Sequence, residues 1–586
     1  MKMFDSESPF IFAARTSGPH SPTAAALSLA RPFEAMNIPS PIRTLKHSTS
    51  RVASIRLRAR LKLTLGLALC LVFASLNAAA RQASKLPAPD KIVGAYVKAV
   101  GGKKRLAALR DVTYEWAVRR KAQEAEAGTA RTQFKPPSSA RTDIILADGE
   151  LDAAANSRSA WVRDREGTLR TLTGREALAA RLRGTLEAGG FVDYKKQNVL
   201  ARTVAREDLG GESAYVVEFS TRAGARLRYW FGVASKLPLQ MSDEALALRV
   251  SFGEWRARAG SPILLEPHRM EIEQSGSDAL VLTLREARYN SGLADALFEP
   301  PGDPSLDIAA LLGELERNQD EVDKRVNEYT FTRKVTEREV NDRGELKEER
   351  VNVYEVYPFV GYGWIQKHVG ENGAALKPER AAKEEKRVAE EMLKAERDLP
   401  KREAEREKER AKREAKKGKK GEAADEGDDV GIATFLRAWE LVSPRRERFQ
   451  GRDTIVFDFR PRPGFRPSSR GENIVSKLAG IVWVDPVERQ IMRLEARLVE
   501  GFKIAGGLAV SIRPGAAFVF EQTRLADGVW LPRYSQVSVS ARVFLLAGMT
   551  INQTNEFSDY KRFSAKAGED KLDAPKQEKP EAPQEP

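Results

Sequence analysis

The chain has 586 residues, 41% of them hydrophobic and 31% charged, with a formal net charge of +14 at pH 7. This length suits two to four domains, and the apolar content is sufficient for folded cores. Residues 1–80 hold ten Lys/Arg and three Asp/Glu, so half of the net charge lies there. Basic stripes interleaved with stacking aromatic residues are absent, which excludes nucleic acid from the expected partners.

A basic segment and an apolar run near the N-terminus predict an export signal. RLRAR (Arg56–Arg60) precedes Leu61–Ala80, and the small residues Ala78 and Ala80 form an Ala-x-Ala cleavage site. We therefore expect a periplasmic protein, or one anchored to the inner membrane if the signal is not cleaved. The run holds the only cysteine, Cys70, so no disulfide is expected in the exported chain.

The residues before this signal, 1–50, are rich in Ser, Pro and Ala and lack periodicity. An exported protein does not need them. We interpret them as an over-long gene model, with translation starting near Val52.

After the leader, apolar periodicity predicts helices that alternate with groups of strands. Within Asp90–Leu109 a helix is expected, with Asp90 as the N-cap and Gly101-Gly102 as the stop, and further helices are expected at Gly174–Gly190 and Leu306–Val326. Runs such as VTYEWAV (Val112–Val118), bounded by turn residues, predict strands.

A strongly charged insertion interrupts the second region. Lys377–Asp429 is mostly Lys, Arg, Glu and Ala, with the two signs nearly balanced and too few large apolar residues for a core. It predicts a solvated helix with i,i+4 ion pairs that frays into a flexible segment near Gly418. A coiled coil would need apolar a and d positions, which are missing. The next segment, Ile432–Val442, predicts an amphipathic helix carrying Phe435 and Trp439.

Two stretches about 240 residues apart repeat one pattern. GESAYVVEF (Gly211–Phe219) and LRYWFGVASKLPLQM (Leu227–Met241) match GRDTIVFDF (Gly451–Phe459) and GIVWVDPVERQIMRL (Gly480–Leu494). Each copy has a glycine turn, a short strand, an aromatic strand of period two and a strand leading away. A repeat of this length indicates two copies of one domain.

Strands outnumber helices, and many alternate apolar with polar residues, so one face of each antiparallel sheet is buried. We therefore predict an α+β fold, mainly β, with two tandem curved antiparallel sheets, each covered by helices. The predicted parts are a leader at 1–80, a first domain at 81–303, a second domain at 304–563 with the insertion at 377–429, and a disordered tail at 564–586.

Four of these segments resemble the outer-membrane lipoprotein-sorting protein family, the periplasmic LolA-like carriers. They are IVGAYVKAVGGKKRLAALRDV (Ile92–Val112), SAWVRD (Ser159–Asp164), FEPP (Phe298–Pro301) and VWVDPVERQIMRLE (Val482–Glu495). The resemblance covers roughly residues 90–301 and, more loosely, 306–563. It implies two tandem LolA-like domains. Each would be a half-barrel of antiparallel strands capped by helices, with a hydrophobic cavity between sheet and lid that takes up acyl chains.

The residue inventory argues against an enzyme. After the leader only two histidines remain, His268 and His368, and neither has metal-ligand spacing. The Ser-x-x-Lys at Ser558–Lys561 lacks the partner motifs of penicillin-binding enzymes. We therefore expect no catalytic residue, no metal and no cofactor, and an enzyme such as a hydrolase is the last of our hypotheses.

Large apolar side chains are the candidate ligand-binding residues. The simplest interpretation of any one of them is an ordinary core residue, but an acyl-binding cavity needs such side chains beneath a movable cover. The candidates lie on predicted strands and mid-domain helices: Trp116, Trp161, Leu178, Leu182, Leu186, Trp230, Phe435, Trp439 and Trp483.

The first functional hypothesis is an exported, non-enzymatic carrier or chaperone that holds lipids or acylated lipoproteins in a hydrophobic cavity. Burial of a CH₂ group contributes about 0.8 kcal/mol, so a carrier of acyl chains needs no polar signature in its sequence. The alternative is an envelope sensor or scaffold that binds a membrane-bound partner through the insertion Lys377–Asp429.

Overall fold

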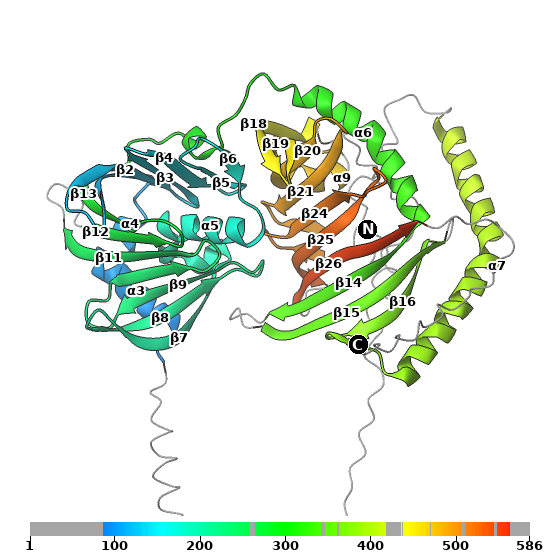
Figure 1. The fold of residues 1–586 in the computed structure, drawn as a ribbon, viewed down its shortest axis with the longest axis horizontal. Coiled ribbons are helices and arrows are strands. Elements are labelled where there is room, and N and C mark those ends of the chain that lie inside the picture. The colour runs from blue at the N-terminus through cyan, green and yellow to red at the C-terminus, as the bar shows by residue number, and fades with distance from the viewer. Residues whose placement is uncertain are drawn as a thin grey trace, which may run out of the picture.

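The computed structural model describes residues 86–562, apart from 258–263, 341–345, 360–362, 418–434, 436, 469, 505–509 and 544–547. Two antiparallel sheets stand side by side in it, with helices on their faces (Figure 1). The predicted fold class, mainly β with two tandem helix-covered sheets, is confirmed. The leader, the cleavage site at Ala78 and Ala80, and the tail lie outside the described residues.

In the first half, the described residues form one thirteen-stranded sheet and three helices. The helices are α3 (Pro89–Ala99), α4 (Lys103–Leu106) and α5 (Gly174–Glu187), with 3-10 turns η1 (Gly190–Val192), η2 (Tyr194–Gln197) and η3 (Asp295–Phe298). The strands are β1 (Val112–Arg120), β2 (Glu126–Lys135), β3 (Ser139–Leu146), β4 (Gly149–Ala155), β5 (Ala160–Arg163), β6 (Leu169–Thr171), β7 (Leu200–Leu209), β8 (Glu212–Ser220), β9 (Arg226–Gly232), β10 (Pro238–Asp243), β11 (Leu248–Ala257), β12 (Leu265–Gln274) and β13 (Leu280–Tyr289).

The second half contains the other sheet. Its described helices are α6 (Ile308–Arg325), α7 (Pro378–Lys417) and α9 (Arg470–Val475), with the 3-10 turn η4 (Val326–Glu328). The strands are β14 (Tyr329–Val340), β15 (Leu346–Phe359), β16 (Gly363–Glu371), β17 (Ala374–Ala375), β18 (Trp439–Phe449), β19 (Arg452–Pro461), β20 (Leu478–Asp485), β21 (Gln490–Leu498), β22 (Phe502–Ile504), β23 (Val510–Ile512), β24 (Ala517–Arg524), β25 (Trp530–Val543) and β26 (Gly548–Arg562).

The repeat in the sequence is also a repeat in topology. The first sheet has the order β6-β5-β4-β3-β2-β1-β13-β12-β11-β10-β9-β8-β7, and the second has β17-β16-β15-β14-β26-β25-β24-β21-β20-β19-β18. In both sheets the last strand pairs with the first, and a helix, α3 or α6, precedes that first strand. The repeated motifs occupy β8 and β9 in one sheet and β19 and β20 in the other, at equivalent places.

Helix α3 begins two residues earlier than its sequence predicts. Its N-cap is Ala88 and Pro89 takes the first helical position, where the missing N–H of proline has no cost. The prediction of Asp90 as N-cap was therefore wrong. The Asp90 carboxylate instead accepts hydrogen bonds from Tyr194 and, at 2.5 Å, from Lys195, which ties α3 to η2.

Helix α6 covers one face of the second sheet. Its side chains Ile308, Leu312 and Leu315 join a buried cluster with Phe457 of β19 and Val482 of β20. All eight residues of β20 are buried, because the opposite face is also covered. Such a strand carries a continuous apolar run, as the sequence shows.

The helix predicted at Ile432–Val442 ends early. Phe435 and Ala438 are helical, but Trp439 already belongs to β18 and faces Pro461 of β19 in the sheet register. The Trp439 ring stacks on Phe459 at 3.9 Å between centroids, and its Nε1 donates to the Val475 carbonyl at 2.8 Å. Pairing and stacking in the sheet override the local helical pattern.

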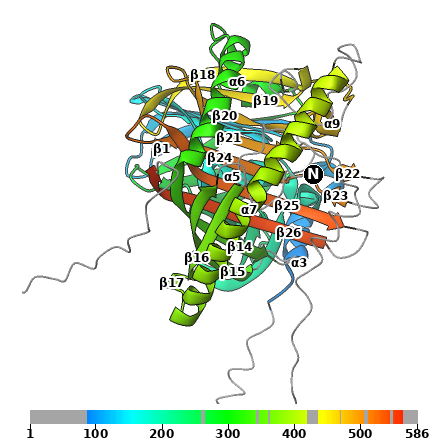
Figure 2. The same cartoon turned by 90° about the vertical axis from the view of Figure 1, so that its right-hand side faces the viewer.

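The charged insertion forms α7, a forty-residue helix. The sequence predicted a fully solvated helix, and this was wrong for one side of α7. Val388 and Ala395 on that side are buried against Ile365 of β16. Other side chains of α7 stay in water, such as Leu393, which is 66% exposed. Figure 2 shows α6 and α7 crossing the side of the second sheet that faces away from the first half.

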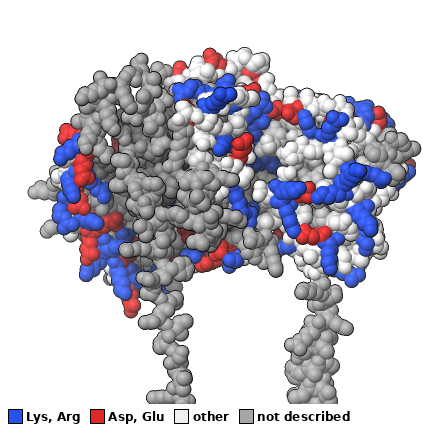
Figure 3. Space-filling view, turned by 180° about the vertical axis from the view of Figure 1, so that it is seen from behind, with Lys and Arg blue, Asp and Glu red and all other residues white. Residues whose placement is uncertain are grey.

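The two halves meet where edge strand β6 of the first sheet lies against edge strand β18 of the second. Seen from behind, Lys and Arg side chains form a broad group on the first half, broken by acidic groups (Figure 3). Within the described residues, no helix combines the length and the apolar character that a membrane span requires.

Candidate functional site

A cleft of about 750 Å³ lies where the two halves face each other, and we call it the central cleft. One wall is α5, which lies inside the curve of the first sheet, at the end toward the second half (Figure 1). The other wall is a face of β21, β24 and β25. Both halves are therefore needed to form the cleft.

Helix α5 contributes both to the core of the first half and to the central cleft. It ends before Gly189, whose φ of +99° suits glycine after a helix. Leu182 and Leu186 are part of the core of the first half, and Leu178 packs against it. Leu178, Arg181 and Leu182, which lie within one turn of the helix, also border the cleft.

Strand β21 gives the opposite wall a charged surface. Alternation places Arg493, Glu495 and Arg497 on the cleft face, while Ala496 packs on the other face in the core beneath α6. The carbon-rich part of the lining comes from Leu178, Leu182, Val199, Ala479, Ala517, Val519 and Phe557. Apolar and cationic groups therefore share one cavity.

The carboxylates of this wall already have cationic partners. Arg493 donates to Glu495 Oε1 through Nε at 3.0 Å and through Nη2 at 2.8 Å, and also to Glu521. Glu521 in addition accepts from Arg533 at 3.2 Å. Glu495 and Glu521 are therefore neutralised within the sheet itself.

Arg181 and Arg497 have no carboxylate ion pair among the residues that the structure describes. Arg181 donates from Nη1 to the backbone oxygen of Arg158 at 3.2 Å. Burial, and after it the charge of Arg181, lower the pKa of Arg497 to about 9. Burial also lowers the pKa of Arg181, against the opposing effect of Glu495 and Asp458. Both guanidiniums therefore border the same cleft at partly buried positions, and the charge of Arg181 acts on Arg497.

The structure disperses the nine predicted ligand-binding residues. Leu178 and Leu182 border the central cleft. The others lie in separate clusters. Leu186 is in the core of the first half, Trp116 is on β1 and Trp161 on β5, and Phe435 and Trp439 lie beneath α6. Trp483 and Trp230 lie on the faces of β20 and β9 that point away from the helices. Ligand binding by these residues stays a prediction.

Trp230 and Trp483 hold equivalent positions in the two repeats and point away from the helix-covered cores. Trp483 is fully buried with Met492 and Trp530, and the Arg493 guanidinium lies 5.8 Å from its ring. Trp230 is half-buried and donates from Nε1 to Glu207 at 2.8 Å. Period-two alternation therefore removes both from the hollow under the helices.

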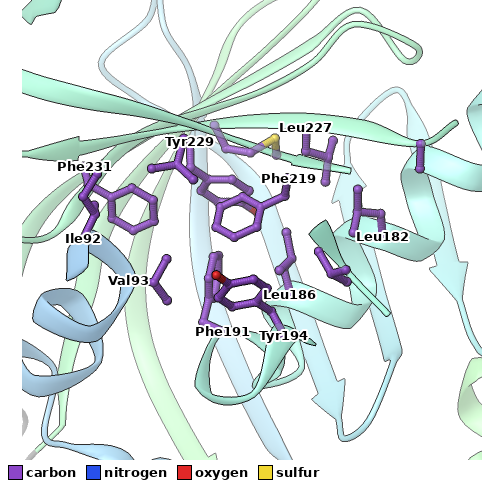
Figure 4. Packing of buried hydrophobic residues seen from close by; sticks show 14 of the residues in the cluster. Ile92, Val93, Leu182, Leu186, Phe191, Tyr194, Phe219, Leu227, Tyr229 and Phe231 are labelled. Carbon is purple, nitrogen blue, oxygen red and sulfur yellow. The ribbon is translucent and has the colours of Figure 1, made fainter. Parts of the chain in front are cut away.

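The hollow of the first sheet is filled by the protein's own side chains (Figure 4). The Phe191 ring meets Phe219, Tyr229 and Phe231 edge-on, at centroid distances of 5.5, 5.2 and 6.3 Å. Edge-to-face aromatic packing of this kind stabilises a core beyond the area it buries. The central cleft, which α5 also borders, is the open space that the described residues offer a ligand beside this core.

The sequence reasoning missed Arg158, Arg181 and Arg497. The available signal was the alternation of charged and apolar residues in RLEARL (Arg493–Leu498), which indicates a strand with one polar face. That pattern does not show that α5 of the other half covers the face. Only the contact between the halves brings the three side chains together.

The residues considered for catalysis do not converge. His268 and His368 belong to different sheets, and Ser558 Oγ donates to its neighbour Asp559 at 2.8 Å. The described residues contain no group of three or more His, Cys, Asp or Glu arranged to hold a metal.

No protein-family model matches the sequence, and no curated protein matches it. Similar solved structures include a DUF1329 family protein from Desulfovibrio piger, with 17% identity and a TM-score of 0.24, covering 36% of this chain and 96% of that one. A LolA superfamily protein from Nitrosomonas europaea has 15% identity and a TM-score of 0.25, covering 36% of this chain and 98% of that one.

The MucA/MucB complex from Pseudomonas aeruginosa has 6% identity and a TM-score of 0.16, covering 81% of this chain and 99% of that one. The family that the sequence motifs resemble is therefore among the structures similar to this chain. These similarities concern the fold alone.

Proposed function

We propose that this protein is an exported, non-enzymatic carrier that holds an amphiphilic ligand by its acyl chain in the central cleft. The cleft itself supports this most directly. Its volume of about 750 Å³ falls in the range of about 300–1,000 Å³ that ligand sites occupy. Its lining joins alkyl and aromatic groups to guanidiniums, which suits a ligand with a hydrocarbon part and a polar part.

The hydrocarbon part supplies a limited share of the binding energy. Ten CH₂ groups against Leu178, Ala517 and Val519 would contribute about 8 kcal/mol at about 0.8 kcal/mol each. Association costs at least about 4 kcal/mol of that. The remaining 4 kcal/mol corresponds to a Kd of about 1 mM. Tight binding therefore requires polar contacts as well.

The export signal predicted at residues 56–80 supports a periplasmic location for this carrier. Lipids and acylated lipoproteins are the ligand classes with acyl chains there. The proposal needs no covalent step, so it makes no demand on catalytic groups.

Mass spectrometry of organic extracts tests the proposal on protein purified from its native envelope. We expect a co-purified acyl lipid. In a binding assay with an 18-carbon fluorescent fatty acid, Ala517→Trp should lower affinity at least tenfold, because Ala517 lines the cleft. Val487→Trp is the matched control, since Val487 is 80% exposed outside the cleft. Empty extracts together with no fatty-acid binding by the wild type would refute the proposal.

A second candidate function is an envelope sensor or scaffold that binds a membrane partner through α7. The exposed side of α7, with Leu393 at 66% exposure opposite the buried Val388 and Ala395, supports it. Leu393→Asp should then weaken capture of the partner without lowering lipid uptake. If lipid uptake falls and partner capture persists, this candidate is excluded.

A further inference from the structure

Resting on the proposed function, we infer that Arg181 of α5 and Arg497 of β21 form a site for the anionic headgroup of the ligand, a phosphate or carboxylate. The two side chains come from different halves of the chain and border the same central cleft. Residues from both halves would thus bind the polar end of the ligand.

Both side chains extend from rigid elements. Arg181 lies in the middle of α5, and its Nη1 is held by the Arg158 carbonyl at 3.2 Å. Arg497 lies on β21 and is paired in register with Ala517 of β24 and Ala479 of β20. Those small neighbours leave the Arg497 guanidinium unobstructed on its strand. A preorganised pair of guanidiniums loses little conformational freedom when it binds an oxyanion.

The donors of this pair are largely unused. A guanidinium carries five N–H donors, and Arg181 uses one of them among the described residues. Glu495, a carboxylate of the same wall, already accepts two hydrogen bonds from Arg493. The hydrogen-bonded ion pairs of this wall therefore involve Arg493, while Glu495 acts on Arg181 and Arg497 through its charge alone.

Two like charges in a poorly solvated cleft raise the free energy of the ligand-free protein. The lowered pKa of Arg497 and the lowered pKa of Arg181 agree with that geometry. An oxyanion placed between them removes the repulsion and accepts charge-assisted hydrogen bonds, which are about twice as strong as neutral ones. An arginine that only supports the fold usually has an acidic partner within the protein. The arginines of an anion-binding site lack such a partner until the ligand binds.

The carbon-lined part of the cleft begins directly beside this pair. Leu178 precedes Arg181 by one turn of α5, and Ala517 stands opposite Arg497 in the sheet register. Val519 continues the apolar lining along β24. A headgroup at Arg181 and Arg497 therefore directs an attached acyl chain along the apolar lining.

Isothermal titration of three dodecyl amphiphiles, each below its micelle concentration, tests the site. Dodecyl phosphate should bind at least tenfold tighter than neutral dodecyl maltoside, and cationic dodecyltrimethylammonium should bind weakest. The double variant Arg181→Gln/Arg497→Gln should lose the phosphate preference and keep its affinity for the maltoside. Arg175→Gln, the same charge loss at an exposed position of α5 outside the cleft, should behave as the wild type.

The outcomes separate the headgroup site from the carrier function. Equal binding of all three headgroups, or a phosphate preference that survives the double variant, overturns the headgroup site and leaves the carrier intact. If inorganic phosphate alone binds as tightly as dodecyl phosphate and loses its affinity in the double variant, the anion site stands and the carrier function falls. If neither amphiphile nor phosphate binds, both fall. Thermal unfolding of the ligand-free double variant, expected to occur at or above the wild-type temperature, excludes misfolding as the cause.

Discussion

The guanidinium of Arg445 in the second half donates from Nη2 to the hydroxyl of Thr171 in the first half at 2.6 Å. Thr171 in turn donates its backbone N–H to Glu447 Oε2 at 2.7 Å, so β6 and β18 are joined by a two-way contact. Arg445 is 2% exposed and is also paired with Asp458 at 3.0 Å. A buried polar network of this kind fixes how the two sheets meet, and the central cleft depends on that arrangement.

Removal of the Arg445 charge is expected to destabilise the protein strongly. Arg445→Met leaves Glu447 and Asp458 buried without their main cation, which typically costs about 3–5 kcal/mol. Urea unfolding followed by tryptophan fluorescence measures the loss. Arg448→Met on the same strand is the control, because the Arg448 side chain is 74% exposed and its pair with Asp453 contributes little. Similar shifts for the two variants would contradict a structural role for the network.

Glu187 at the end of α5 is expected to make stability depend on pH. Burial raises its pKa to about 7; Arg183 opposes the rise and Asp243 adds to it. The folded state therefore binds more protons than the unfolded state between the ordinary pKa near 4.5 and about 7. Stability should fall as pH rises through that window, by up to about 3 kcal/mol from this group.

Glu187→Gln isolates this contribution, because the amide stays neutral at every pH. Thermal unfolding from pH 4 to pH 8 should show the variant progressively more stable than the wild type as pH rises, with the two curves meeting below about pH 4.5. A constant difference across the range would show that Glu187 titrates normally in the folded protein.

Adjacent residues of β9 should differ sharply in their contribution to stability. Phe231 is fully buried in the hollow of the first sheet, and Phe231→Ala should cost about 3–5 kcal/mol. Trp230 points to the other face and is half-buried, so Trp230→Ala should cost about 1 kcal/mol. Chemical denaturation of both variants measures the contrast. If Phe231→Ala is tolerated, the hollow is not the packed core that the contacts indicate.

Arg497→Met should stabilise the ligand-free protein by about 1 kcal/mol. The substitution keeps most of the alkyl stem and removes one of two like charges in the cleft. Differential scanning fluorimetry in phosphate-free buffer detects the higher unfolding temperature, and Arg175→Met serves as the control. A lower unfolding temperature would mean that the Arg497 charge supports the fold itself.

Local patterns in the sequence account for most of the architecture. The paired motifs at Gly211–Phe219 and Gly451–Phe459 predict a duplicated unit, and both form strands at equivalent places because each buries one face by period-two alternation. The apolar stripe of α5 likewise predicts its packing into a core. Burial of a single element against its own sheet is encoded within that element.

Features that depend on distant partners could not be predicted in this way. The strand at Trp439 depends on pairing with β19, and the burial of Val388 depends on β16 lying beneath α7. The cleft pair Arg181 and Arg497 depends on the contact between two halves. The periodicity of one segment does not show which face of one half contacts the other half. That contact depends on residues such as Thr171, which carry no recognisable signal in the sequence.

Gly480 is the repeat position where the two copies differ most in size, since Leu227 stands there in the first copy. In the sheet register Gly480 lies opposite Phe459, and a Cβ at this position would overlap the Glu495 carbonyl and come within 2.7 Å of Phe459 Cζ. The Phe459 ring cannot retreat, because it stacks on Trp439.

Gly480→Ala is therefore expected to destabilise the second half by about 1–3 kcal/mol or more, through backbone displacement in a tightly packed sheet. Gly94→Ala in α3 is the matched control, because a Cβ there has no heavy atom within 4 Å, and alanine in a helix should stabilise by about 0.5–1 kcal/mol. Urea midpoints that move in opposite directions for the two variants are the expected result. A neutral Gly480→Ala would mean that β20 and its neighbour β21 move more easily than the complete burial of β20 implies.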